Sequence, residues 1–283
     1  INEYGADSLR FTLISMASPG RDVKLSKERV TGNRNFITKI WSANNFLKLN
    51  NCKLNKKANI KLIKTPINQW IFNEYIETQN EVSKNIESFR FDEAAKKVYQ
   101  FVWHLYCDWY LEFLKPIFNS KNKEQINESK HFASFMMANI LKLLHPFIPF
   151  FTETVWHKNN YKTFFRKDLI TSDWPNYQRL NKYKKNQDDI NNLIELISSI
   201  RSAKAELKIT PKLFCNISFN EKSSKIKKLI ENNLSLFKQV GRVNDIIRKI
   251  KNDKNSLEIL SLKEKITLEF SEDVDLISQK ERI

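Results

Sequence analysis

The chain has 283 residues, only four of which are glycine, and a formal charge of +16 at pH 7. This length allows one large or two ordinary domains whose hydrophobic core needs no disulfide bonds. The scarcity of glycine argues against β-sandwiches and glycine-rich phosphate-binding folds, and together with the many Leu, Ile, Lys and Glu residues it favours long helices, so we expect a mainly α protein.

The charge suggests a polyanionic partner. Cationic side chains that neutralise phosphates release condensed counterions, so nucleic acid is the first candidate among such partners. An AT-rich genome, which favours Lys, Asn and Ile codons, accounts for the 48 Lys and Arg residues equally well. Charge alone therefore leaves both explanations open.

The cysteines and the hydropathy pattern indicate the compartment. Cys52, Cys107 and Cys215 form no C-x-x-C pair, so we expect free thiols in a reducing environment. The chain has no signal-peptide pattern at Ile1 and no apolar run long enough to span a bilayer. We expect a cytoplasmic protein that does not associate with membranes.

The first predicted helix follows a short, mixed segment of residues 1–25. Ser26 is a suitable N-cap, and helical spacing continues to about Leu49. At about 100° per residue, the two sides of this helix differ in character. The apolar side holds Ile37, Ile40, Trp41, Asn44 and Leu47, and the opposite side holds Asn35, Lys39, Ser42 and Phe46.

Further helices are predicted up to about residue 156. One begins at Pro66 and runs to about Ser88, and Asp92 is the predicted cap of the next. That next helix, through residues 94–115, is apolar on most sides and should lie centrally in a bundle. Its polar residues form one stripe, consisting of His104, Asp108, Glu112 and Lys115.

Proline positions define the end of this predicted bundle. A helix from His131 to about Leu144 should end at the "HPFIPF" stretch, where two prolines each remove a backbone donor. Thr152 is then the predicted cap of a short helix that ends near Trp156. A polar segment follows, and we expect a domain boundary there.

The remainder of the chain predicts a small α+β module. A helix from about Asp188 to Leu207 has a buried stripe of Leu193, Leu196, Ile197 and Ile200. The stretch "KLFCNISF" alternates like a strand, "SSKIKKLIENNLSLF" is helical, and "VNDIIRKI" and "EKITLEF" have strand character.

Catalytic constellations are scarce. The four histidines are scattered, and the chain has no nucleophile-elbow, phosphate-loop or paired-histidine metal motif. We expect His104 to be a structural histidine facing the core and His145 to be a packing or helix-end residue. Residues 24–27 resemble a lysine loop for ATP, but no glycine follows them directly, and Ser26 fits an N-cap better.

Two residues are candidates for contacts with nucleic acid. Phe46 lies near a lysine on an otherwise polar helix face, where an aromatic ring can stack on a base. Glu112 can accept a hydrogen bond from the exocyclic amine of cytosine or adenine. The alternatives are that another helix covers Phe46 and that Glu112 pairs with Lys115.

Five stretches together resemble one family. "YGADSLRFTL", "SPGRDVKL", "GNRNFITKIWSANNF", "FRFDEAAKKVYQFVWHLYCDWYLEFLKP" and "LLHPFIPFFTETVW" follow, in order, the C-terminal half of the valyl-tRNA synthetases, which are class I aminoacyl-tRNA synthetases. The resemblance is strong over residues 1 to about 178 and weaker beyond. Isoleucyl enzymes share the general bundle, but "PGRDVKL" followed by "RNFITKIW" is more similar to the valyl family.

The resemblance implies a domain organisation. Residues 1–25 would end the connector from the catalytic domain, 26–178 would form an anticodon-binding helix bundle, 179–272 a small α+β module, and 273–283 the start of a coiled-coil arm. In this family the ATP-stabilising lysine loop lies upstream of "YGADSLRF", so we expect a fragment without catalytic motifs that is inactive alone. The full-length parent would use ATP and Mg²⁺ to activate valine, esterify it to tRNA(Val) and edit mischarged tRNA. We expect no catalytic residue, metal or cofactor in this segment.

The resemblance also implies an anticodon-binding site and a partner. The matching positions are Arg29, Arg34, Lys39, Phe46, Leu111 and Glu112. The family commonly has Arg where this chain has Asn45, which removes a cation next to Phe46. The implied partner is tRNA(Val), bound by a monomer. The rival hypotheses are the equivalent part of an isoleucyl enzyme and a basic helical protein-interaction module.

Overall fold

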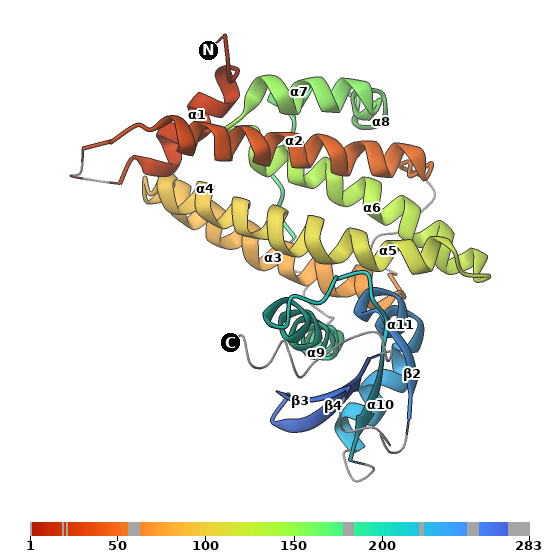
Figure 1. The fold of residues 1–283 in the computed structure, drawn as a ribbon. Coiled ribbons are helices and arrows are strands. Elements are labelled where there is room, and N and C mark those ends of the chain that lie inside the picture. Colours follow the sequence, from red (N-terminus) through yellow and green to blue (C-terminus); the bar gives the residue numbers. More distant parts are fainter. Residues whose placement is uncertain are drawn as a thin grey trace. The chain divides into compact units, whose positions relative to one another are not determined.

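The computed structural model describes residues 2–18, 20, 22–55, 63–177, 184–220, 224–247 and 255–270. It divides into two compact units, Ile1–Lys184 and Lys185–Ile283. The first unit is a helix bundle, and the second combines helices with one small mixed sheet (Figure 1). The prediction of a mainly α protein with a small α+β module is confirmed.

The described part of the first unit is entirely helical. Its elements are α1 (Ala6–Met16), α2 (Lys27–Leu49), α3 (Pro66–Glu87), α4 (Phe91–Gln100), the π-helix η2 (Phe101–Tyr110), α5 (Leu111–Phe118), α6 (Lys123–Leu144), α7 (Pro149–Lys158), α8 (Tyr161–Phe165) and the 3₁₀-helix η3 (Leu169–Thr171). In Figure 1, α4, η2 and α5 form one continuous rod that runs beside α3 and α2. We refer to residues 91–118 as the central rod.

Local sequence rules located two helix starts. The Ser26 side chain accepts a hydrogen bond from the Arg29 amide at 3.4 Å and caps α2 as predicted. Pro66 occupies the first turn of α3, where its missing N–H has no helical partner to lose. Both confirmed predictions concern residues whose effect depends only on their own chain neighbours.

Two predicted caps are wrong. Asp92 lies inside the first turn of α4, where its carboxylate accepts from the Arg90 guanidinium and from the Ser18 hydroxyl instead of capping the helix. Thr152 lies inside α7, and its hydroxyl donates to the Ile148 carbonyl one turn earlier. In both cases the side chain has a partner that competes with the capping interaction.

The bundle contains helical segments that the sequence did not predict. α1 lies within residues 1–25, and the Asp7 carboxylate on it accepts from the Phe151 amide at 2.6 Å. α6 begins at Lys123, two turns before the predicted start, because Asn122 caps it by accepting from the Gln125 amide. The π-helix in the middle of the central rod is also unpredicted.

Tyrosine hydroxyl groups satisfy polar atoms in the core of the bundle. Tyr75, Tyr106 and Tyr110 are each fully buried. The Tyr110 hydroxyl donates to Asn68 Oδ1 at 2.9 Å, which joins the central rod to α3. Burial raises the pKa of Tyr110 well above its ordinary value, so the phenol stays neutral and keeps this hydrogen bond.

Asp92 stabilises the start of the central rod. Its side chain is 6% exposed, and the hydrogen bonds and charge of the Arg90 guanidinium hold the pKa of this carboxyl at about 2. Because the folded-state pKa is depressed, the contribution to stability is complete above the ordinary carboxyl pKa and is lost as the pH falls towards 2.

We expect Asp92→Asn to lower the free energy of unfolding by about 2 kcal/mol at pH 7, and by progressively less below pH 4. Urea unfolding at several pH values measures this difference. Glu93→Gln is the matched control, because its pair with Arg90 at 3.5 Å is solvent-exposed and should contribute less than about 0.5 kcal/mol. A loss of stability in Asp92→Asn that stayed constant down to pH 2.5 would contradict this explanation.

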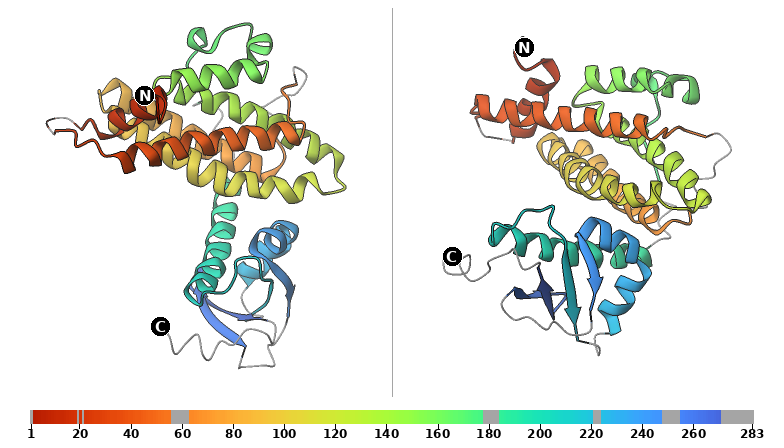
Figure 2. Two further views of the ribbon diagram at one scale, coloured as in Figure 1. Left: turned by 45° about the horizontal axis from the view of Figure 1, so that its top comes forward. Right: turned by 45° about the vertical axis from the view of Figure 1, so that its right-hand side comes forward.

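The second unit packs helices against a four-stranded sheet (Figure 2). Its elements are α9 (Lys184–Glu206), β1 (Cys215–Phe219), α10 (Ser224–Asn232), α11 (Leu234–Gly241), β2 (Val243–Ile246), β3 (Ser256–Ser261) and β4 (Glu264–Glu269). The strand order is β2-β1-β4-β3, with β1 and β2 parallel and the other pairs antiparallel.

The predicted helices and strands of this unit are confirmed where the structure describes them, and β3 is an addition. The stretch "SSKIKKLIENNLSLF" forms α10 and the start of α11, and residues 248–250 of the strand predicted over "VNDIIRKI" lie outside the described residues. The predicted stripe of α9, from Leu193 to Ile200, is buried. Lys204 on the same helix is also buried, and its ammonium donates to the Leu213 carbonyl at 2.8 Å. The expected coiled-coil start at residues 273–283 lies outside the described residues. None of the described helices is both long and apolar enough to cross a bilayer.

Candidate nucleic-acid interface

Two contacts join α2 to the central rod. The Lys39 ammonium forms an ion pair with Asp108 Oδ1 at 2.5 Å and lies 4.0 Å from the centre of the Trp103 ring. Further along, the Phe46 ring stacks on Phe118 with a centroid distance of 6.2 Å and an angle of 20° between the planes. We call the line of contact between α2 and the central rod that these residues mark the seam.

Aromatic rings and polar side chains share this seam. We call its half-exposed residues the stacking face, which consists of Lys39, Phe46, Trp103, Asp108, Glu112 and Phe118. Beyond this face, Tyr99 stacks on Trp103 at 5.5 Å, and the Lys130 ammonium lies 5.7 Å from the centre of the Phe118 ring. Partly exposed rings beside ammonium groups suit single-stranded nucleic acid, whose bases stack while its phosphates need cations.

Phe46 was predicted either to be an exposed ring for base stacking or to be covered by another helix, and the structure is intermediate between the two. Phe118 covers one side of the Phe46 ring, but the residue remains only half-buried. This contact with Phe118 restricts the orientations that Phe46 can adopt. The pair can therefore support a base with little additional loss of side-chain freedom.

For Glu112 the structure shows the alternative interpretation, which is a pair with Lys115. Its carboxylate forms an ion pair with the Lys115 ammonium at 2.5 Å, and the two side chains are 38% and 51% exposed. An exposed pair of this kind contributes about 0–1 kcal/mol, so a ligand can replace Lys115 at little cost. The neighbouring Leu111 is buried and belongs to the wall of the rod.

The structure does not bring the two arginines to this face. Arg29 and Arg34 are exposed on α2. Arg34 is five residues before Lys39, which places it roughly 140° away around the helix. Arg29 lies ten residues before Lys39, near the start of α2. Their role in binding therefore stays a prediction, separate from the stacking face.

The polar stripe of the rod is confirmed, but one prediction within it is wrong. His104 was expected to face the core, whereas its side chain is 60% exposed and its Nδ1 lies 3.6 Å from Asp108 Oδ2. Asp108 therefore has two cationic or potentially cationic neighbours, His104 and Lys39. His145, by contrast, is a helix-end residue as predicted, and its Nδ1 lies 2.9 Å from the Thr152 hydroxyl.

Sequence reasoning missed Phe118 and Trp103 as members of the face. The signal for Phe118 was present, since it follows Lys115 by three residues and so continues the stripe around the helix. For Trp103 no signal distinguished a half-exposed ring from a core ring. Asp108 was identified as polar, but its partner on α2 depends on how the two helices pack.

A pocket of about 400 Å³ lies on another side of α2, at its C-terminal end. Its lining comes from α2, α6, α7, α8 and residues 51–54. Three of the lining residues are lysines, namely Lys48, Lys53 and Lys158. Residues 48–64 and 242–251 are two basic stretches of the sequence that could contact phosphates. In their described parts Lys64 forms an ion pair with Glu124, and residues 56–62 and 248–251 lie outside the described residues.

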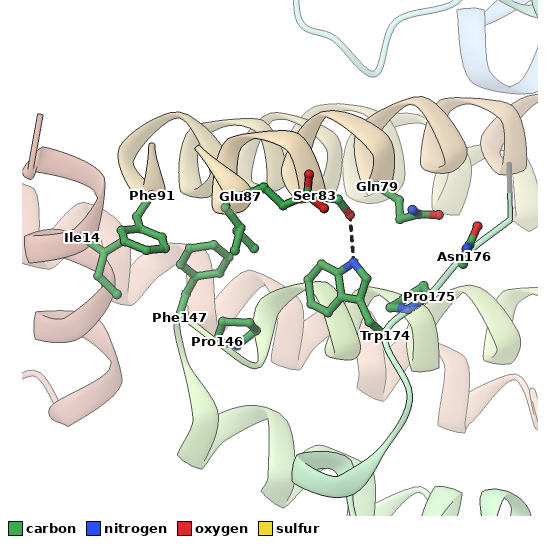
Figure 3. A pocket seen from close by; sticks show the side chains of 11 residues that line it. Ile14, Gln79, Ser83, Glu87, Phe91, Pro146, Phe147, Trp174, Pro175 and Asn176 are labelled. Atoms are coloured by element: carbon green, nitrogen blue, oxygen red, sulfur yellow. Dashed lines mark hydrogen bonds between the residues drawn. The ribbon is translucent and has the colours of Figure 1, made fainter. Parts of the chain in front are cut away.

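An apolar pocket of about 670 Å³ lies near the start of the central rod (Figure 3). Phe91, Phe147 and Trp174 provide its aromatic lining, and the Trp174 indole donates to the Ser83 hydroxyl at 2.8 Å. The charged residue that lines it is Glu87. A carboxylate without a lining cation repels phosphate, so this pocket is not suited to nucleic acid.

A cluster on α7 and η3 was also not predicted. Glu153, His157 and Asp168 could together hold a metal ion. Their ligand atoms already have partners, since Glu153 accepts from the amides of Leu169 and Ile170, and the Lys162 ammonium lies 2.9 Å from Asp168. The Lys162 ammonium would compete with a metal ion for Asp168. The cluster is therefore explained as a hydrogen-bond network that fixes η3 to α7.

The three cysteines are free, as expected. Burial raises the pKa of Cys52 and of Cys107 to about 12. Both thiols are therefore protonated at neutral pH and unsuited to nucleophilic chemistry.

Comparison with known proteins gives consistent matches. Residues 68–219 match the family described as the anticodon-binding domain of tRNA ligase. The chain is 42% identical to a valine–tRNA ligase of Pelagibacter ubique, over 98% of its own length and 31% of the relative. It is 36% identical to that of Agrobacterium fabrum, over 100% of its own length and 30% of the relative. The chain thus spans about a third of the length of these relatives.

A comparison of folds matches a chain from a solved Agrobacterium radiobacter K84 LeuRS–tRNA–LeuAMS complex, with a TM-score of 0.48 and 11% identity. The match covers 88% of this chain and 30% of the other. This similarity is too low to support an argument, so the family relationship rests on the sequence matches.

Proposed function

Because the chain belongs to the anticodon-binding domain family of tRNA ligases, we propose that it binds the anticodon of tRNA(Val) as part of a valine–tRNA ligase. The observation that carries this proposal is the near-parallel ring pair of Phe46 and Phe118, which lies on the same seam as the Lys39–Asp108 ion pair. The match to valine–tRNA ligases over almost the whole chain supports the choice of amino acid.

Binding begins with unpaired anticodon bases turned away from their own stack. Single-stranded RNA is recognised when such bases stack on aromatic rings and form hydrogen bonds along their edges. The Phe46–Phe118 pair offers the stacking surface at one end of the face, and Trp103 offers a ring at the other. A base on either ring has Lys39 or Glu112 within the same seam for hydrogen bonding.

The polar groups of the face select among bases and phosphates. Lys39 donates to acceptors such as a phosphate oxygen or a base carbonyl, and Asp108 holds this ammonium in place until the RNA arrives. Glu112 accepts from an exocyclic amine once the RNA displaces Lys115. Leu111, which precedes Glu112 in the chain, is buried and anchors this part of the rod in the core.

The chemistry of the ligase belongs to other parts of the parent enzyme in this proposal. Valine activation with ATP and Mg²⁺, transfer to tRNA and editing need residues outside the motifs of this chain. Residues 24–27, which resemble a lysine loop, include the cap of α2, Ser26, and its first residue, Lys27. We place this function in the cytoplasm, in a monomeric enzyme.

Titration of tRNA binding against salt tests the proposal. At low salt we expect tRNA(Val) to bind and its affinity to fall about 100-fold between 50 and 200 mM salt, as roughly four neutralised phosphates would require. Filter binding or fluorescence anisotropy of labelled tRNA measures this slope. Heparin of similar charge is the control for generic polyanion binding, and it should compete only weakly at 200 mM.

Absence of tRNA binding at 50 mM salt would favour the rival hypothesis of a protein-interaction module. Equal competition by heparin at every salt concentration would show that the positive charge acts without selecting tRNA. Preference for tRNA(Ile) over tRNA(Val) would point to the isoleucyl alternative.

A further inference from the structure

The 400 Å³ pocket at the end of α2 is separate from the stacking face. Asn44, which lines it, precedes Phe46 by two residues, so the two side chains point roughly 160° apart around α2. Both residues lie in the last two turns of α2, whose final residue, Leu49, is 83% exposed. A chain that left the stacking face could reach the pocket by passing around this end.

The charge in this pocket has one sign. Lys48, Lys53 and Lys158 line it, and none of its lining residues is Asp or Glu. The Lys48 ammonium donates to the Lys158 carbonyl at 3.1 Å, and the Lys158 ammonium lies 4.7 Å from the centre of the Trp41 ring. Neither contact neutralises an ammonium charge, because a carbonyl and an aromatic ring carry no net charge.

The helix ends around the pocket do not offset this charge strongly. The carbonyls of Phe46, Leu47 and Lys48 at the end of α2 accept from the amides of residues 50–52. At the end of α7, the carbonyls of Val155 and His157 accept from the amides of residues 159 and 160. Capped carbonyls carry less of the partial negative charge that an open helix C-terminus would present.

Two amide side chains in the pocket have unused hydrogen-bonding groups. Asn44 is 1% exposed, and its Nδ2 has no partner. Its Oδ1 accepts from Asn159 Nδ2 at 2.7 Å, and Asn159 Oδ1 also has no partner. A buried polar group without a partner costs about 1–3 kcal/mol, so native proteins rarely retain one without a function.

These unused groups are buried, and a small rotation of the two amide side chains would present them to a base in the pocket. One is a donor and the other an acceptor, and they belong to two side chains that are hydrogen-bonded to each other. Adjacent donors and acceptors are the pattern on the edges of adenine and cytosine. Phe164, which is half-buried and also lines the pocket, adds an aromatic ring.

We propose that this pocket holds one unpaired nucleotide of the bound RNA, with its base edge at Asn44 and Asn159 and its phosphate among Lys48, Lys53 and Lys158. The inference rests on the proposed function, since the nucleotide belongs to the same tRNA. It adds a second contact point that none of the six predicted binding residues provides. Such a contact anchors the RNA strand on the far side of α2 from the stacking face.

The test compares two triple variants of the full chain with equal changes of charge. The pocket variant combines Lys48→Gln, Lys53→Gln and Lys158→Gln. The matched control combines Lys84→Gln, Lys121→Gln and Lys123→Gln, which are exposed lysines that do not line the pocket. We expect the pocket variant to bind tRNA(Val) about 10-fold more weakly than the parent, and the control less than threefold more weakly.

A second arm uses free CMP and AMP, followed by amide chemical shifts of residues 158–163. We expect saturable shifts in the parent and at least a 10-fold loss of nucleotide affinity in Asn159→Asp. This variant keeps the shape of the side chain, and Asn44 can still pair with it by donating from Nδ2. Inorganic phosphate at the same concentration separates recognition of a nucleotide from binding of an anion alone.

Each outcome decides the inference. Stronger binding of CMP or AMP than of phosphate, together with the loss in the pocket variant, supports it. Equal shifts with phosphate alone, or equal tRNA affinities of the two triple variants, would overturn it. If Phe46→Ala weakens tRNA binding while the pocket variants do not, the proposed function stands and this inference fails. If tRNA does not bind at all, the nucleotide arm still decides whether the pocket takes a nucleotide.

Discussion

Replacing Phe46 by alanine is expected to weaken the binding of tRNA(Val) about 10-fold, because stacking of one base on an aromatic side chain contributes roughly 1–3 kcal/mol. The same change removes one ring of the Phe46–Phe118 pair, so Phe118 loses the neighbour that orients it. Discrimination between anticodons should fall together with affinity. Equilibrium binding of labelled tRNA measures both quantities.

Two further variants control this experiment. Phe46→Tyr keeps a ring of the same size and should bind tRNA within about twofold of the parent. Phe150→Ala removes a ring that is 66% exposed on α7 and outside the stacking face, and it should have no effect on affinity. Because Phe46 is only half-buried, thermal unfolding of Phe46→Ala should remain cooperative. An unchanged affinity in Phe46→Ala would show that the ring pair does not contact the RNA.

The parts of the fold that were predictable depend on neighbours in the chain. Ser26 caps α2 and Pro66 begins α3 because each acts on backbone groups within one helical turn. The predicted cap at Asp92 failed because Arg90 and Ser18 compete for the same carboxylate, and Ser18 lies in a distant part of the chain. Local rules cannot rank such a tertiary partner against a cap.

In the candidate site, too, local features were predictable and tertiary partners were not. A spacing of about 100° per residue placed Lys39 and Phe46 on one face of α2. The partner of each was not predictable, because Asp108 and Phe118 are paired with them only by the packing of α2 against the central rod. His104 was placed in the core because apolar residues surround it in sequence. The unpredicted π-helix from Phe101 to Tyr110 includes this residue, whose side chain is exposed.

The six predicted binding residues fall into two groups, those that the structure brings together and those that it does not. Lys39, Phe46 and Glu112 meet on the stacking face because their helices pack together, with the buried Leu111 behind them. Arg29 and Arg34 came from a resemblance between sequences, which gives positions along a chain but no direction for a side chain. Contacts of these two residues with RNA would have to form on other sides of α2.

The most direct test of the account exchanges the anticodon of tRNA(Val) while keeping the rest of the tRNA. Each mismatched base at a position that is read should cost about 1–3 kcal/mol, by analogy with sequence-specific readout in DNA. Replacing all three bases is therefore expected to weaken binding at least about 100-fold, measured by competition against labelled tRNA(Val). The reciprocal exchange, which gives another tRNA the valine anticodon, should recover most of the affinity. Equal affinities of the original and exchanged tRNAs, within about twofold, would contradict the claim that this chain reads the anticodon.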